Sequence, residues 1–350
     1  MKIQDMNLDE VTIVILSRER NEVLAETLIY WSNYSISVLI LHNSSTPLPS
    51  NKIPPNARYY NLNINYGGRA GHAAQLITTP YAIMSSDDEV FLPSAIIAAK
   101  DMLNNDNELV SVGGQTLAVG KYGSIYNMTI PYKFNLDYRN IGDSPAERLF
   151  IHFSGPMGYR NGSLYRVIRS SALKQVLSVF SQLGNIPTPY IYEATGEILI
   201  NGLGKSEYIK DLIWVRNWLN KPIQNNQWQR SNYFFKWVEG EKIQFELWKE
   251  KLNSFLFIKP ERFNELIDVF TNLMNSSDIN AMRKNYKLRN KVPKKIRYLI
   301  TYALQRNNGL INLQDAVKNL NAQELLFELS ELNLAIQYLT KNSVNLSSLN

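Results

Sequence analysis

The sequence predicts an α/β fold: a mostly parallel sheet flanked by helices, with a helical region at the C-terminal end. Three observations predict it. Short β-branched apolar runs alternate with helical patterns over the first 105 residues, which is typical of right-handed βαβ units. Residues 11–17 are apolar on both faces, as expected of a strand buried between two layers. From about residue 230 onward the apolar spacing is nearly all helical, with few Gly or Pro residues.

The individual elements follow from local patterns. Apolar, β-branched runs that end in polar or glycine-containing stretches predict strands at 11–17, 37–42, 58–62, 81–84, 109–118, 124–130 and 164–168. Apolar residues at helical spacing, such as Leu24, Leu28 and Trp31, predict helices at 22–34, 67–77 and 93–104. The middle of the chain, 130–216, mixes loops with two further helices.

Composition excludes several classes of function. The 350 residues include no cysteine, which removes disulfides, thiolate zinc sites and a cysteine nucleophile. The three histidines lack metal-ligand spacing, and no secretory signal or membrane-spanning run is present. The net charge of +6 owes much to a basic cluster at 284–297. Such a cluster is either a solvated helix face or a surface for an anionic membrane or acidic glycan; no nucleic-acid motif accompanies it.

The most informative segment is 79–93. The apolar run 81–84 is followed by three consecutive acids, Asp87, Asp88 and Glu89. Adjacent carboxylates repel one another, so a fold tolerates them in water or around a cation. In an open α/β sheet the carboxyl ends of strands are also where ligands bind. Hard oxygen ligands at this place suit Mg²⁺ or Mn²⁺ carrying a phosphorylated substrate; a solvated acidic turn is the alternative.

Four blocks together resemble a bacterial group of inverting, nucleotide-sugar-dependent glycosyltransferases with the Rossmann-like GT-A fold, close to the large family 2 class. The blocks are 12–31, 38–45, 79–93 and 193–216, and the resemblance covers roughly residues 11–218. Two positions depart from the pattern of that family. Asn43 stands where many members have an Asp that contacts the nucleotide, and Glu89 stands where the metal motif usually ends in Asp.

The resemblance implies a set of site residues. The catalytic base would be Glu193, at the start of a helix, where partial burial would raise its pKa; Glu197, one turn further, is the alternative acid. The implied donor-binding residues are Ser17, Glu19, Arg20, Asn43, Arg69 and Asp87. The implied acceptor- or phosphate-binding residues are Arg148, Lys205, Trp214 and Arg216. The implied ligands of a Mn²⁺ or Mg²⁺ cofactor are Asp87, Asp88 and Glu89.

Each of these residues also has an alternative, purely structural interpretation. A helix-start acid interacts favourably with the helix dipole, arginines form ion pairs, and tryptophan is more often a core residue than a sugar platform. Arg18 is a second candidate beside Arg20 for binding phosphate. Gly67-Gly68, just before Arg69, is either the start of an anion-binding helix or a plain turn.

The resemblance therefore predicts a cytoplasmic, metal-dependent glycosyltransferase of surface polysaccharide, capsule or lipopolysaccharide biosynthesis. Its partners would be a nucleotide-sugar donor and a glycan or lipid-linked acceptor, with peripheral contact at the inner membrane face and no nucleic acid. We expect a catalytic domain over 1–225, with its donor half to about 120, and a helical domain or layer over 226–350. Two alternatives stay open: an inactive sugar-nucleotide- or glycan-binding module, and a nucleotidyltransferase. The latter normally has a Gly-rich phosphate loop, which 17–20 lacks.

Overall fold

The computed structural model describes residues 8–122, 125–130, 139–154, 162–184, 189–218, 233–274, 320 and 325–340. The strands are β1 (Leu8–Arg18), β2 (Ile36–Asn43), β3 (Ala57–Asn61), β4 (Tyr81–Ser85), β5 (Val90–Phe91), β6 (Leu109–Tyr122), β7 (Ile125–Thr129), β8 (Val167–Arg169) and β9 (Lys205–Asn217). The helices are α1 (Asn21–Trp31), α2 (Tyr66–Leu76), α3 (Pro93–Asn105), α4 (Pro145–Ser154), α5 (Ser170–Gln182), α6 (Pro189–Leu203), α7 (Tyr233–Gly240), α8 (Lys242–Leu256) and α12 (Leu329–Thr340). Two short 3-10 turns, Ser50–Lys52 and Ser163–Tyr165, and a helix at 260–274 complete the described elements.

A nine-stranded sheet forms the centre of the molecule, in the order β3-β2-β1-β4-β8-β6-β9-β5, with β7 paired to β6. Strands β3, β2, β1 and β4 are mutually parallel, and β6 and β9 run in the same direction. Strand β8 runs against both β4 and β6, and β5 and β7 are also antiparallel to their partners. The fold is thus the expected α/β architecture with a mostly parallel sheet.

The alternation of side chains along β1 divides the core into two clusters. Ile13 and Ile15 belong to the cluster that includes Leu28 of α1, whereas Val14 belongs to the opposite cluster with Leu173 of α5. Successive side chains of a strand point to opposite faces, so a run that is apolar at every position requires cover on both sides. The prediction of a doubly covered strand at 11–17 is confirmed.

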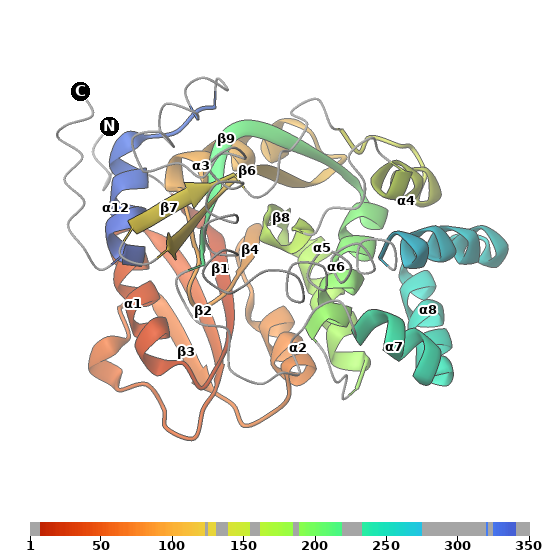
Figure 1. Ribbon diagram of the computed structural model, residues 1–350, viewed down its shortest axis with the longest axis horizontal. Helices are drawn as coiled ribbons and strands as arrows, with labels where there is room; N and C mark the ends of the chain where they lie inside the picture. The colour runs from red at the N-terminus through yellow and green to blue at the C-terminus, as the bar shows by residue number, and fades with distance from the viewer. Residues whose placement is uncertain are drawn as a thin grey trace, which may run out of the picture.

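Helices cover each face of the sheet. The core cluster on one face contains residues of α1, α3 and α12, and the cluster on the other contains residues of α2, α5, α6 and α8. Figure 1 shows α1 and α12 on one side of the strands and α2, α5, α7 and α8 on the other. The alternating strands and helices of the first 105 residues agree with the expected elements to within a few residues.

The C-terminal region is helical, as expected, and its described parts lie in two places. Helices α7 and α8 pack beside α6, whereas α12 packs on α1 at the far side of the sheet (Figure 1). The expected domain boundary at 225 and the basic cluster at 284–297 lie outside the described residues. Among the residues that the structure describes, no helix combines the length and the apolarity needed to cross a bilayer.

Candidate functional site

The acidic turn, residues 86–89, follows β4 at the carboxyl edge of the parallel strands. Asp87 and Glu89 are each only 5% exposed, and Asp88 is half-buried. Strand β4 lies next to β1 and pairs in register up to Ile15 and Ser85, so the turn sits beside the end of β1. The prediction that the acids follow the end of a strand is confirmed. The alternative, a solvated acidic turn, does not agree with the burial of Asp87 and Glu89.

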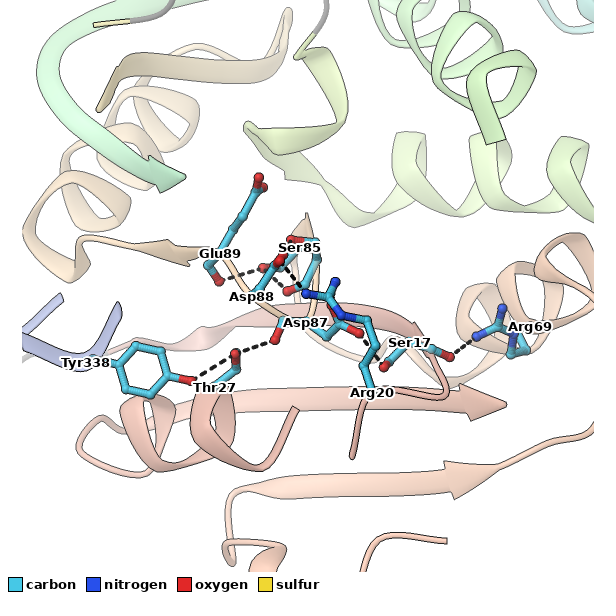
Figure 2. A network of polar contacts seen from close by, with 10 residues as sticks. Ser17, Arg20, Thr27, Arg69, Ser85, Asp87, Asp88, Glu89 and Tyr338 are labelled. Carbon is cyan, nitrogen blue, oxygen red and sulfur yellow. Dashed lines mark hydrogen bonds and ion pairs between the residues drawn. The ribbon is translucent and has the colours of Figure 1, made fainter. Parts of the chain in front are cut away.

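Asp87 and Asp88 share one arginine. Arg20 donates from Nη1 to Asp87 Oδ1 and from Nη2 to Asp88 Oδ2, each at 2.6 Å. Ser17 donates its hydroxyl to the other oxygen of Asp87 at 2.6 Å (Figure 2). Burial raises the pKa of Asp87 to about 6, although Arg20 and the Ser17 hydrogen bond oppose that shift. The predicted donor residues Ser17, Arg20 and Asp87 are therefore brought together.

Glu89 has a separate set of partners on β9. Its carboxylate accepts hydrogen bonds from Trp214 Nε1 and from Arg216 Nε, both at 2.9 Å. Burial raises the pKa of Glu89 to about 7 against the opposing effect of Arg216. Figure 2 shows the Glu89 carboxylate directed away from Asp87 and Asp88. Residues 89, 214 and 216, which the sequence placed in different roles, thus form one buried unit.

The three acids do not fit a shared metal ion in this arrangement. Ser86 donates to the remaining oxygen of Asp88 at 2.8 Å, so every carboxylate oxygen of the acidic turn has a donor from the protein. Arg20 and Arg216 already balance the charges that a divalent cation would balance. Within the described part of the chain, no group of three His, Cys, Asp or Glu side chains is placed to hold a metal. Metal binding by Asp87, Asp88 and Glu89 stays a prediction.

Trp214 is a packed residue rather than an open platform. It is 3% exposed, and its ring stacks on Tyr165 with a centroid distance of 4.2 Å and an interplanar angle of 12°. Phe91 lies parallel to it at 6.3 Å, and the Arg216 guanidinium lies 4.6 Å from its centroid. One interpretation of the sequence was that a sugar stacks on Trp214, but the Trp214 ring has no free face here.

Arg69 acts inside the fold. Its guanidinium, 3% exposed, donates to the carbonyl of Ser17 and, at 3.2 Å, to that of Leu41. It therefore joins the ends of β1 and β2 instead of facing a ligand. The start of α2 is capped by Asn65, whose side chain accepts from Gly68 N at 2.8 Å. Gly67 is required for packing, because a Cβ there would meet the carbonyl oxygen of Phe180 at 2.5 Å.

The loop after β1 and the loop after β2 are tied to each other. Glu19, in the left-handed region at φ 50°, accepts from Ser44 Oγ at 3.0 Å and from Ser45 N at 2.9 Å. Asn43 donates its amide to the carbonyl of Ile64 at 2.8 Å. Both predicted donor residues thus order the loops at the expected nucleotide position. Arg18, the second phosphate candidate, is exposed, and no partner is described for its guanidinium.

Glu193 lies half-buried on α6. Burial raises the pKa of Tyr165 well above its usual value, and the charges of Glu193 and Glu89 add to the shift. Burial and Glu193 likewise raise the pKa of Tyr66. Because the pKa of Tyr165 responds to both Glu193 and Glu89, Tyr165 lies within electrostatic reach of both carboxylates. The predicted base and Glu89 of the acidic turn therefore both act electrostatically on Tyr165. The sequence had assigned no role to Tyr66 or Tyr165.

Glu197, the alternative acid, is a structural residue. It is 1% exposed and accepts hydrogen bonds from Gly162 N at 2.5 Å, Ser163 N at 2.6 Å and Ser163 Oγ at 2.5 Å. His152 Nε2 lies 3.2 Å from Glu197 Oε2, the oxygen that also accepts from Ser163 Oγ. Burial alone would raise the pKa of Glu197, but these partners hold it below its usual value. The carboxylate therefore fixes the loop at Gly162 and Ser163.

Arg148 and Lys205 lie away from the acidic turn. Arg148 donates to the carbonyls of Gly142, Asp143 and Gly202. Lys205 begins β9, and its ammonium pairs with Glu108 at 2.6 Å. Arg216 lies near the other end of that strand. These two predicted acceptor- or phosphate-binding residues therefore lie apart from Glu89 and Arg216.

Comparisons with known proteins give a fold-level likeness. No family model matches the chain, and no curated protein does. Among solved structures, the chain is similar to TarS of S. aureus, with 10% identity over 70% of this chain and 42% of that one, at a TM-score of 0.41. It is similar to residues 1–349 of TarS in complex with UDP-GlcNAc, with 10% identity over 75% of this chain and 80% of that one, at a TM-score of 0.47. The chain thus spans 42% of the first TarS chain that it matches.

Proposed function

We propose that this chain is a glycosyltransferase that moves a sugar from a nucleotide-sugar donor to a glycan or lipid-linked acceptor. One observation carries the proposal. At the carboxyl edge of the parallel strands, where ligands bind in open α/β sheets, Asp87 and Glu89 are buried with raised pKa values, and the charges of Glu89 and Glu193 both act on Tyr165. Carboxylates held against their ordinary ionisation preference at such an edge mark a candidate active site.

In the proposed reaction, the Glu193 carboxylate takes the proton of an acceptor hydroxyl. The hydroxyl oxygen forms a bond to the anomeric carbon while the bond from that carbon to the donor phosphate breaks. The nucleoside diphosphate leaves with the electron pair of that bond. General-base assistance of this kind contributes about 10²- to 10⁴-fold in rate.

The negative charge on the departing diphosphate needs a cationic partner. Arg18 suits this role because it is exposed at the end of β1, whereas Arg20 and Arg216 are engaged with the acidic turn. Arg18 is also close enough to Arg69 to lower the pKa of that residue, after the larger effect of burial. The exposed Arg18 guanidinium at this strand edge favours an anionic ligand there, whereas the buried Arg69 guanidinium is engaged by backbone carbonyls.

Metal dependence is a separate part of the proposal. The acidic turn would have to release some of its protein donors to bind Mn²⁺ or Mg²⁺. The experiment below therefore includes a metal arm, and no step of the proposed reaction passes through an ion.

The test is a panel of UDP-, GDP-, dTDP- and CMP-sugars incubated with the purified chain, in the presence of Mn²⁺ and of EDTA. Release of free nucleotide is the readout. We expect turnover of one donor, with an Arg18→Ala variant raising KM for that donor about tenfold through the lost charge. Arg58→Ala serves as the control, because Arg58 donates to Leu76 on α2 and is not at the proposed phosphate site. Absence of turnover with every donor would contradict the proposal.

A second function has an observation in its favour. Because every carboxylate oxygen of the acidic turn is engaged by the protein, a binding module that recognises a nucleotide sugar without cleaving it would have the same structure. Titration calorimetry with the same panel distinguishes the two. Heat of binding for one donor without nucleotide release identifies the module.

The cellular role follows from the resemblance of the sequence. Surface polysaccharide, capsule or lipopolysaccharide synthesis on the cytoplasmic side of the inner membrane, with peripheral contact to that membrane, is the setting we propose for this activity. A nucleotidyltransferase is disfavoured, because the segment after β1 that would hold its phosphate loop is 17–20 and contains no glycine.

A further inference from the structure

The backbone of the acidic turn is held by Thr27 of α1, 60 positions away in the sequence, and Thr27 is held in turn by Tyr338 of α12. Thr27 of α1 donates its hydroxyl to the carbonyl oxygen of Asp87 at 2.6 Å, and both residues are buried. Tyr338 of α12 donates its hydroxyl to Thr27 Oγ1 at 3.1 Å (Figure 2). The hydroxyl proton of Thr27 is used toward Asp87, so Thr27 can only accept from Tyr338. The direction of this chain of hydrogen bonds is therefore fixed.

The same helix also caps the segment that follows the turn. Helix α3 begins at Pro93, and its N-cap residue, Leu92, offers no capping side chain. Glu331 of α12, fully buried, accepts from Ser94 N at 3.1 Å and from Ser94 Oγ at 2.8 Å. A carboxylate at this place satisfies an otherwise unpaired backbone donor and interacts favourably with the helix dipole. Helix α12 thus supplies the cap that α3 lacks.

Between these two anchors, α1 contributes a third. Tyr30 donates to the carbonyl of Phe91 at 2.8 Å, and its ring packs against that of Tyr338 at 5.6 Å. The backbone from residue 87 to residue 94 is therefore fixed at three points by α1 and α12. Its side chains, Asp87 and Glu89, are the ones that the proposed function assigns to the site.

We infer that α12 holds the acidic turn in its working geometry, and that Tyr338 is a positioning residue that acts on Asp87 through Thr27. The inference rests on the proposed function only for its effect on activity. The physical claim, that loss of one hydroxyl on α12 loosens residues 86–92, is independent of which reaction the site performs. A buried carbonyl without a well-held donor is costly, so weakening the chain favours local opening of the turn.

The test is hydrogen exchange, followed by mass spectrometry, of a peptide covering 84–92 in the full chain. We expect about fivefold faster exchange in Tyr338→Phe, the opening expected from the loss of one net hydrogen bond. Tyr81→Phe is the matched control. Its hydroxyl also bonds to a side chain, that of Asn104, but it lies at the opposite end of β4. Unchanged exchange in Tyr338→Phe, or the same increase in Tyr81→Phe, overturns the inference.

Variants of Thr27 test the order of the chain. Thr27→Ser keeps the hydroxyl and should exchange like the wild type, whereas Thr27→Val should exchange at least as fast as Tyr338→Phe. Because Tyr338 acts through Thr27, adding Tyr338→Phe to Thr27→Val should produce no further increase. Additive effects of the two changes would show that Tyr338 does not act through Thr27.

Activity provides the last readout. With the donor found in the panel, kcat should fall about fivefold in Tyr338→Phe, and in Tyr81→Phe it should stay at the wild-type value. If the wild type releases no nucleotide from any donor, the proposed function fails and the exchange measurement alone decides the inference. A wild-type kcat in a Tyr338→Phe variant whose turn exchanges faster would show that the turn is held by α12 without effect on turnover, which overturns the positioning role.

Discussion

Among the residues that the structure describes, two buried carboxylate clusters are held in opposite ways. Around Glu197, backbone and hydroxyl donors converge with His152, and the pKa of the carboxyl lies below its usual value. In the acidic turn, burial raises the pKa of Asp87 to about 6 and that of Glu89 to about 7, although arginines contact both. Burial alone therefore does not mark a functional acid.

The direction of the pKa shift distinguishes a structural carboxylate from a candidate active-site carboxylate. Hydrogen bonds to the charged form keep Glu197 ionised, and the Glu197 carboxylate in turn fixes the loop at Gly162. Burial instead raises the pKa values of Asp87 and Glu89 toward neutral pH, which is the condition expected of an active site. The variants below test this contrast, beginning with the largest expected effect.

Replacing Asp87 should affect activity far more than stability. In Asp87→Asn we expect kcat/KM for the donor to fall at least about 100-fold, because a preorganised charge at the reacting centre is lost. The urea midpoint should fall less than in the Glu197 variant described next, since burial already disfavours the charged carboxyl and the Ser17 hydroxyl can turn to accept from the new amide. Wild-type turnover by Asp87→Asn would remove this residue from the site.

Replacing Glu197 should have the reverse effect. We expect Glu197→Gln to lower the free energy of unfolding by about 3 kcal/mol, because an amide cannot accept all the hydrogen bonds that reach this buried carboxylate. Urea unfolding measures the loss. At a temperature where the variant is folded, kcat/KM should stay within about threefold of wild type, since the residue acts through packing. A selective loss of turnover with unchanged stability would restore Glu197 as the alternative acid.

The same cluster predicts how stability depends on pH. Burial lowers the pKa of His152, and the partners of Glu197 lower its pKa in the folded state. A group with a depressed folded pKa binds fewer protons when folded, so its contribution to stability is lost as the pH falls. We expect that loss to begin below 6.5, the usual value for His, and to deepen below 4.5, the usual value for Glu. Urea unfolding from about pH 7 to about pH 5 should show a shallower slope in His152→Gln than in wild type; equal slopes would contradict it.

Replacing Lys205 should have the smallest effect. Lys205→Met removes an ion pair with Glu108 at the end of β9 opposite Arg216. We expect no measurable change in kcat/KM or KM for the donor, with thermal unfolding as the stability check. A rise in KM for donor or acceptor would show that Lys205 contacts substrate, as the resemblance of the sequence implied.

Local patterns in the sequence predicted the strands and helices of the first 105 residues, but they missed β9 (Lys205–Asn217), which lies in a region predicted to contain loops and two helices. The two-sided apolar run of β1 required two helical layers, and the acids after β4 were placed at a strand end by hydrophobicity alone. Partners from distant segments could not be predicted in this way. Arg20 pairs with the acidic turn, Trp214 is covered by Tyr165, and α12 returns to α1, because the sheet order brings together segments far apart in the chain. Periodicity contains no information about such contacts.

We propose that Glu193 and the acidic turn belong to one active site. The most direct measurement compares Glu193→Gln with wild type, by titration calorimetry for donor binding and by nucleotide release for turnover, in the presence of acceptor. We expect the variant to bind the donor with wild-type affinity and its rate of transfer to fall by about 10²-fold or more. Transfer at the wild-type rate would contradict it.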